Sequence, residues 1–155
     1  AAGGEEATAD PAREALMPEG AGVTLGILAG GRATRLGGRD KAWLQRDGVP
    51  QVARIAGAWS SGCDAVLVSA NRQLARYRDH GMHAVADAAA DLGPLGGLQA
   101  LAAACATDWL FSVPVDAAAS GGGVLAALHA AGSDGAVLED DDGLQPLVAL
   151  YPAVA

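Results

Sequence analysis

The chain has 155 residues, of which 51% are apolar and 4% aromatic, and this favours a single globular domain with an aliphatic core. Eighteen acidic residues against ten basic ones give a net charge of −8, which argues against a protein that binds nucleic acid through its phosphates. No apolar run approaches the ~20 residues of a membrane span, and the first residues lack the pattern of a secretory signal.

Two cysteines, Cys63 and Cys105, have neither a Cys-x-x-Cys partner nor a nearby histidine. This spacing argues against a disulfide scaffold and against a zinc site, so we interpret both thiols as reduced and buried. Reduced thiols in turn favour a protein of the cytoplasm.

Residues 1–21 are rich in Ala, Gly, Glu and Pro without periodicity and are expected to form a disordered or poorly ordered extension, so residues 22–155 are the predicted folded domain. In that domain, short apolar runs alternate with segments of helical spacing. In chain order the sequence predicts a strand over Val23–Leu28, a loop over 29–42, a helix over 50–61, a strand over Ala65–Ser69, a helix over 71–80 capped by Asn71, a strand over His83–Ala86, a helix over Leu98–Ala106, a strand over Trp109–Val113, a helix over Gly123–Ala131, and strands over Ala136–Leu138 and Leu147–Tyr151.

This alternation of strands and helices is typical of an α/β domain with a mostly parallel sheet. The last two strands flank an Asp-Gly turn and are expected to add an antiparallel element. Ligands of such sheets bind at the carboxyl ends of the strands, so the loops after Leu28, Ser69 and Val113 are the predicted functional loops.

The loop after Leu28 combines glycines with basic residues. Residues 32–46 carry five of the ten bases, and Lys41 is the only lysine in the chain. The glycines let backbone amides, such as those of Ala29 and Gly30, approach an anion, and Arg35 and Lys41 can neutralise phosphate charge. The loop matches neither a Walker A motif nor a dinucleotide fingerprint. It predicts a site for a small polyanion, and the alternative is a surface loop with solvated arginines.

The run LAGGRATRLGGRDKAWLQRDGVP, residues 28–50, resembles the N-terminal signature of the molybdenum cofactor guanylyltransferases (MobA type), with Leu36 in place of the family's methionine. Weaker matches extend the resemblance to about Tyr151. They are SANR at 69–72, Asp87 ahead of Gly-Pro-Leu, VPVD at 113–116, where the family's following proline is Ala118, and QPLVALYP at 145–152. The resemblance implies a Rossmann-like three-layer nucleotidyltransferase fold with a mostly parallel sheet and an antiparallel edge element.

The resemblance also implies an enzyme that transfers GMP from GTP to the molybdopterin-bound molybdenum cofactor, with Mg²⁺, releasing pyrophosphate and giving the guanine dinucleotide cofactor. GTP and molybdopterin would be its substrates, and molybdoenzymes or cofactor-handling proteins its protein partners. The residues it implies are, for catalysis, Arg35, Lys41 and Asp116; for the nucleotide, Leu28, Ala29, Gly30, Gly31, Lys41, Asn71, Asp87 and Asp116; and for the metal, Asp116.

Other interpretations stay open. Asn71 could act only as a helix cap, Asp87 and Asp116 only in turns, and Asp40 only as the partner of a neighbouring arginine. The acids over 139–142 are expected to be a solvated turn, and the three histidines to be structural or exposed.

The rival functions are a cytidylyltransferase or another nucleotidyltransferase, a nucleotide-binding accessory module without catalysis, and a structural domain without a ligand. Gly30, Gly31 and Asp40 favour the guanylyl class. Ala118 keeps the accessory module open, as does the end of the chain at Ala155, because the family usually continues further and the domain could be truncated.

Overall fold

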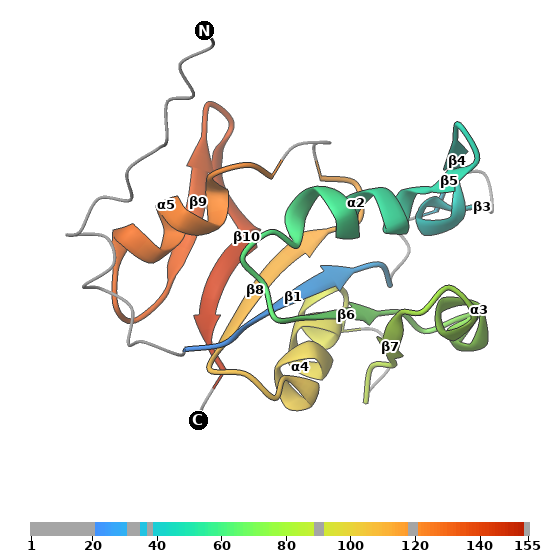
Figure 1. Cartoon of the computed structure of the whole chain (residues 1–155), viewed down its shortest axis with the longest axis horizontal. Coiled ribbons are helices and arrows are strands. Elements are labelled where there is room, and N and C mark those ends of the chain that lie inside the picture. Colours follow the sequence, from blue (N-terminus) through green and yellow to red (C-terminus); the bar gives the residue numbers. More distant parts are fainter. Residues whose placement is uncertain (1–20, 31–34, 37–38, 89–91, 118–120, 154–155) are drawn as a thin grey trace, which may run out of the picture.

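The computed structural model describes residues 21–30, 35–36, 39–88, 92–117 and 121–153 (Figure 1). The extension expected over 1–21 therefore lies, apart from Ala21, outside the described residues. Within the described ranges, no helix combines the length and the apolar character needed to cross a membrane.

A six-stranded sheet with the order β7-β6-β1-β8-β10-β9 forms the centre of the domain. Strands β1, β6, β7 and β8 run parallel, whereas β10 pairs antiparallel with both β8 and β9. The predicted mostly parallel sheet with an antiparallel edge element is confirmed. The strands are β1 (Val23–Leu28), β6 (Ala65–Ser69), β7 (His83–Val85), β8 (Trp109–Pro114), β9 (Ala136–Asp140) and β10 (Gly143–Pro152).

Helices cover both faces of this sheet, which gives three layers (Figure 1). Helix α2 (Gln51–Trp59) lies over one face and α4 (Pro94–Ala104) over the other, while α3 (Leu74–Asp79) and α5 (Val124–Ala131) flank the sheet. Because side chains alternate along a strand, β1 serves both layers. Its Leu25 and Ile27 join one core cluster with Ile55 of α2, and its Leu28 joins a second cluster with Leu101 of α4.

Gly26 of β1 marks the close approach of α4 to the sheet. A Cβ atom added there would lie 2.9 Å from Cδ1 of both Leu101 and Leu110. We expect Leu101→Ala to lower the free energy of unfolding by about 2–5 kcal/mol, because the fully buried leucine would leave a cavity between helix and sheet. Urea unfolding measures this loss. Gln99→Ala, on the exposed side of the same helix, is the control and should change stability little; equal losses in both variants would contradict the packing described.

Several predicted boundaries were wrong. The loop predicted over 29–42 contains the hairpin β2 (Arg35–Leu36) and β3 (Arg39–Asp40) and the 3-10 turn η2 (Lys41–Trp43). A second hairpin, β4 (Gln45–Arg46) and β5 (Val49–Pro50), turns at Asp47-Gly48, where both φ angles are positive, 53° and 79°. Such Asp-Gly turns match the twist of paired strands, so this hairpin had a signal in the sequence.

Helix α4 begins four residues earlier than predicted, at Pro94, and ends at Ala104. Proline is favoured in the first turn of a helix because its missing N–H needs no partner there. Helix α2 ends at Trp59, and the last two strands are longer than predicted. Both cysteines are free, as expected, but they are only half-buried.

Candidate functional site

The order in which strands join the sheet changes side at β1, and this determines where the loops meet. The chain passes from β1 to β6 and β7 on one side and then returns to β8 on the other side of β1. Backbone hydrogen bonds continue beyond the strand ends: the Ala29 N–H donates to the Ser69 carbonyl at 2.9 Å, and the Val115 N–H donates to the Leu28 carbonyl at 3.0 Å. The loops after β1, β6 and β8 therefore meet at one edge, the usual ligand crevice of such sheets.

Lys41 and Asp116 face each other at this edge. Lys41 Nζ lies 3.7 Å from Asp116 Oδ2, although the two residues are 75 positions apart in the chain (116 minus 41). The lysine side chain is 23% exposed and the aspartate side chain 57%, so both can reach a ligand from solvent. The pair places one cation and one carboxylate at the crevice between β1 and β8.

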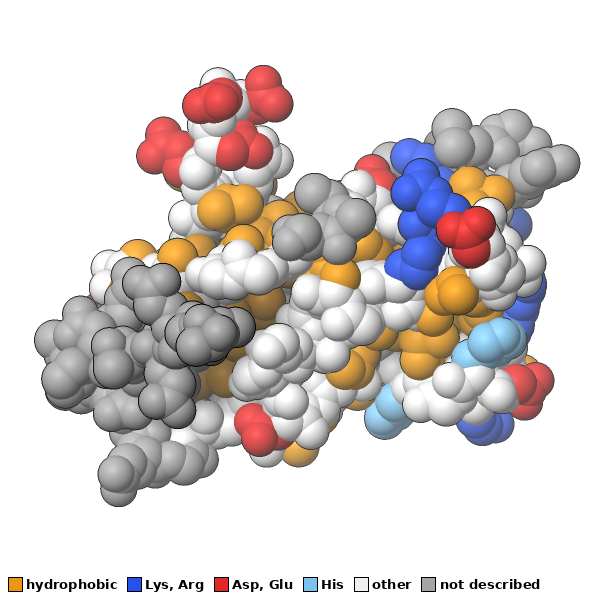
Figure 2. Space-filling view, turned by 45° about the horizontal axis from the view of Figure 1, so that its top comes forward, with side chains coloured by type: hydrophobic (Ala, Val, Ile, Leu, Met, Phe, Trp, Pro, Cys, Tyr) orange, Lys and Arg blue, Asp and Glu red, His pale blue; other side chains and the backbone are white. Residues whose placement is uncertain are grey.

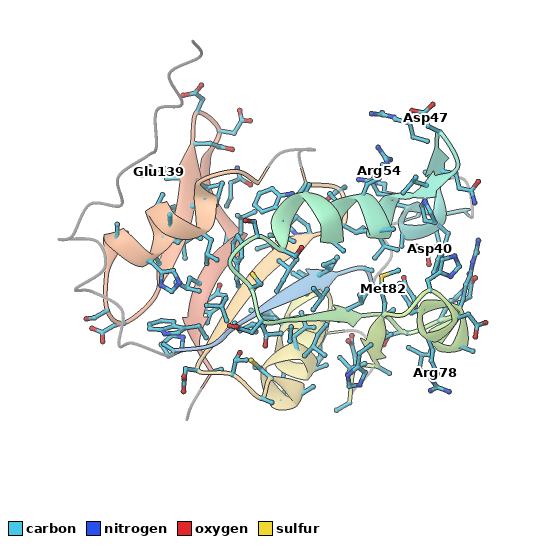
Figure 3. The ribbon with its side chains drawn as sticks, in the orientation of Figure 1. Asp40, Asp47, Arg54, Arg78, Met82 and Glu139 are labelled. Carbon is cyan, nitrogen blue, oxygen red and sulfur yellow. The ribbon has the colours of Figure 1, made fainter. Side chains whose placement is uncertain are left out.

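The short turn that carries Lys41 is held at both ends. Asp40 accepts a hydrogen bond from the Ala42 N–H at 3.0 Å and so caps η2 (Figure 3). Trp43 is buried, with its ring 4.6 Å from Tyr77 and 5.0 Å from His80. Burial, and then the charge of Asp40, raise the pKa of the Tyr77 phenol, which therefore stays neutral in this cluster. Asp40 thus caps the turn that carries Lys41.

Asn71 and Asp87 form a clasp between the loops after β6 and β7. Asn71 Nδ2 donates to Asp87 Oδ2 at 3.2 Å, and the Asp87 N–H donates to Asn71 Oδ1 at 2.9 Å. A Cβ atom on Gly30 would lie 3.4 Å from Asn71 Nδ2, so the loop after β1 joins them. Within the described part of the chain, the buried Oδ1 of Asp87 has no hydrogen-bond partner, which leaves an acceptor for a ligand hydroxyl or amide.

The predicted cap at Asn71 was wrong. Helix α3 begins at Leu74, its cap position is Gln73 with φ 55°, and no side chain caps its first turn. Asn71 is instead committed to Asp87, 16 residues further along the chain. This contact replaces the cap role of Asn71 and brings both residues together where the loops after β6 and β7 meet.

Leu28 and Ala29 lie deeper than their predicted role suggests, with exposures of 5% and 3%. The Ala29 amide already donates to Ser69, so the expectation that this amide meets the ligand was wrong. Gly31 and Ala118 lie outside the described residues, as does the side chain of Arg35, of which only the backbone in β2 is described.

Two glycines of α4 belong to the site although sequence analysis did not single them out. A Cβ atom on Gly96 would lie 2.8 Å from Asp87 Oδ2, and one on Gly97 would lie 2.7 Å from Ser69 Oγ. The first turn of α4 therefore packs directly beneath the clasp. The only sequence signal for this contact is the run Gly-Pro-Leu-Gly-Gly.

This contact leads to a testable expectation for Gly96→Ala. In the nucleotide site that the resemblance implies, the new methyl group should push the Asp87 carboxylate away from Asn71 and weaken GTP binding about tenfold, the effect of one lost hydrogen bond. The same contact should lower stability by about 1–3 kcal/mol, the usual cost of overpacking, of which the better helix propensity of alanine offsets up to ~1 kcal/mol. Gly57→Ala is the matched control, since nothing lies within 4 Å of a Cβ there in α2. Calorimetric titration with GTP would contradict the assignment if both variants bound as the unchanged protein does.

The donor set suits a magnesium ion better than a metal held by protein alone. Within the described part of the chain, no group of three or more His, Cys, Asp or Glu side chains is placed to hold a metal. Mg²⁺ is commonly bound through one or two carboxylates together with substrate phosphates. The exposed carboxylate of Asp116 fits that role.

Comparisons with known proteins bear on this geometry. The family model described as MobA-like NTP transferase domain matches residues 25–155. A molybdenum cofactor guanylyltransferase from Cupriavidus necator is 34% identical over 139 residues, covering 83% of this chain and 70% of the relative. Another from Serratia proteamaculans is 42% identical over 91 residues, covering 58% of this chain and 46% of the relative. The chain thus spans about half the length of the Serratia relative and of a similar one from Cupriavidus metallidurans.

Solved structures support the fold. Molybdopterin-guanine dinucleotide biosynthesis protein A from Archaeoglobus fulgidus superposes with a TM-score of 0.62 at 18% identity, over 84% of this chain and 67% of that one. A nucleotidyl transferase from Methanothermobacter gives a TM-score of 0.66 at 18% identity, over 84% and 71% of the two chains. Both agree with the expected nucleotidyltransferase architecture. From the family match over residues 25–155 and the similarity to the Cupriavidus relative, the chain belongs to the MobA-like NTP transferase domain family.

Proposed function

We propose that the protein transfers GMP from GTP to the phosphate of molybdopterin-bound molybdenum cofactor, releasing pyrophosphate and forming the guanine dinucleotide cofactor. The observation that carries the proposal is the Lys41–Asp116 pair, 3.7 Å apart at the crevice between β1 and β8. The names of the curated relatives support the choice of substrates.

In this proposal the clasp of Asn71 and Asp87 binds the nucleoside, beside Gly30. Its free acceptor, Asp87 Oδ1, and the Asn71 amide have the hydrogen-bonding capacity that a base or a ribose requires. Lys41, beside Asp116 at the carboxyl end of β8, would neutralise the triphosphate. We propose that the side chain of Arg35, which precedes Lys41 in the glycine-rich segment, also neutralises the triphosphate.

The transfer itself forms a bond between an acceptor phosphate oxygen and the α-phosphorus of GTP. It breaks the bond from that phosphorus to the bridging oxygen, and the electron pair leaves with pyrophosphate. A phosphate monoester is largely ionised near neutral pH, since its second pKa is about 6, so the chain needs no general base. Lys41 stabilises the charge that develops on the leaving group.

Asp116 is the residue that would hold Mg²⁺, through its exposed carboxylate. The ion would stabilise negative charge on the phosphate oxygens as a Lewis acid. Because Lys41 Nζ lies 3.7 Å from that carboxylate, the two residues act together in this proposal.

The test is incubation of the protein with GTP, Mg²⁺ and molybdenum-loaded molybdopterin, followed by assay of pyrophosphate and of the dinucleotide. We expect both products with GTP, and far less with CTP or UTP. A CTP preference would favour a cytidylyltransferase. GTP binding without either product would favour an accessory module and overturn the proposal. We place the reaction in the cytoplasm, because both cysteines are free thiols.

A further inference from the structure

A second basic region lies beside the Lys41–Asp116 pair and has no role in the mechanism above. A pocket of about 480 Å³ opens between the β4–β5 hairpin, the start of α2 and the turn after β8. Its lining residues are Arg46, Gln51, Arg54, Ile55 and Ala117. Ala117 directly follows Asp116, so the pocket adjoins the proposed reaction site.

The positive charge around the pocket favours an anionic ligand. Figure 2 shows Lys and Arg side chains gathered in one part of the molecule and the acids of the β9–β10 turn in another. Helix α2 begins at the pocket with no acidic residue in its first turn and no side-chain cap, which leaves the positive end of the helix uncompensated. Between described residues, the structure has no ion pair for Arg46 or Arg54. The nearby acids are Asp116, which faces Lys41, and Asp47 at the tip of the hairpin (Figure 3).

Arg54 is held in place by a neighbouring amide. Gln51 Nε2 donates to the Val115 carbonyl at 3.0 Å, and Gln51 Oε1 accepts a hydrogen bond from Arg54 Nη2. The end of β8 that precedes Asp116 is therefore linked through Gln51 to the guanidinium. Arg54 Nε is shielded from solvent and has no hydrogen-bond partner among the residues that the structure describes. A buried N–H without a partner is costly, and an oxygen of a bound ligand would satisfy it.

We propose that Arg46 and Arg54 bind the phosphate monoester of the acceptor substrate. This inference rests on the proposed function and assigns the second substrate of the same site. The pocket follows β8, whereas Asn71 and Asp87 follow β6 and β7 on the other side of β1. Ala117 of the pocket and the nucleoside clasp thus come from loops on opposite sides of β1. Two guanidinium groups suit a dianionic phosphate, since each can donate two parallel hydrogen bonds.

The test compares Arg54→Gln and Arg46→Gln with Arg78→Gln. Arg78 lies on α3, away from the pocket, and is the matched control (Figure 3). In steady-state assays of pyrophosphate release, each pocket variant should raise the KM for molybdenum-loaded molybdopterin at least ~10-fold, the effect of losing one charged hydrogen-bond partner. The KM for GTP should stay within about twofold. The control should change neither constant.

A binding measurement separates this inference from the proposed function. Calorimetric titration with metal-free molybdopterin should show binding to the unchanged protein and to Arg78→Gln, and at least ~10-fold weaker binding to Arg54→Gln. If the protein binds molybdopterin through Arg54 but forms no dinucleotide, the proposed function fails and the subsite stands. Equal binding by Arg54→Gln, no binding by the unchanged protein, or a rise only in the KM for GTP would each overturn the subsite. Thermal unfolding checks that the variants are folded.

Discussion

Lys41→Ala is expected to slow pyrophosphate release from GTP at least ~100-fold, the scale of removing one electrostatic contact from a transition state. Lys41 is the only lysine of the chain and faces the crevice with its Nζ 3.7 Å from the Asp116 carboxylate. The variant should fold normally, because the turn that carries residue 41 is held by the Asp40 cap and by buried Trp43, neither of which uses the lysine side chain. Steady-state kinetics together with thermal unfolding measures both effects.

Lys41→Arg is the companion variant. It retains the charge but spreads it over a planar fork that differs from an ammonium group in shape, so recovery of activity should be incomplete. Full activity in Lys41→Ala would contradict the assignment, and full activity in Lys41→Arg would show that charge alone is needed at this position.

Asp116→Ala is expected to lower turnover at least ~100-fold at saturating Mg²⁺. A further readout separates a metal ligand from a mere partner of Lys41. Without Mg²⁺, loss of the carboxylate removes negative charge beside the lysine, so GTP should bind as tightly as before or more tightly. With Mg²⁺, the gain in affinity that the ion provides should disappear. Calorimetric titration with GTP, with and without the ion, measures both.

The control for this variant is Asp141→Ala, at the exposed tip of the β9–β10 turn. It removes the same charge from the chain but lies away from the crevice, so kinetics and GTP affinity should stay unchanged (Figure 3, where Glu139 marks this turn). A similar loss in both variants would point to net charge rather than to a metal site.

The parallel strands were the most predictable part of the fold. The bounds of β1 and β6 agree with those predicted, because each strand is a short apolar run between turn residues and is mostly buried on both faces. The start of α4 was missed because Gly96 and Gly97 interrupt the helical spacing of apolar residues. Those glycines are required by the close approach of Asp87 and Ser69, a tertiary contact that local propensity cannot express.

The residues of the candidate site also fall into those that the sequence predicts and those that it does not. The glycine-rich loop and Lys41 could be found because they follow a predicted strand and carry concentrated charge. The contact between Asn71 and Asp87 could not be predicted, because an asparagine that caps a helix and one that bonds a distant aspartate look the same in the sequence. Arg46 and Arg54 were also missed, since a hairpin and a helix bring them to one pocket and the Asp-Gly signal of that hairpin was not used.

The packing of Trp43 has a practical consequence. Its indole lies two residues beyond Lys41, with the Arg76 guanidinium 4.2 Å from the ring centroid. Indole emission is sensitive to nearby charge, so a triphosphate that draws Lys41 toward it should alter the optical signal of the intact protein without any added dye. With Trp59 and Trp109 replaced by phenylalanine, residue 43 would become a built-in reporter of the first moments of substrate capture.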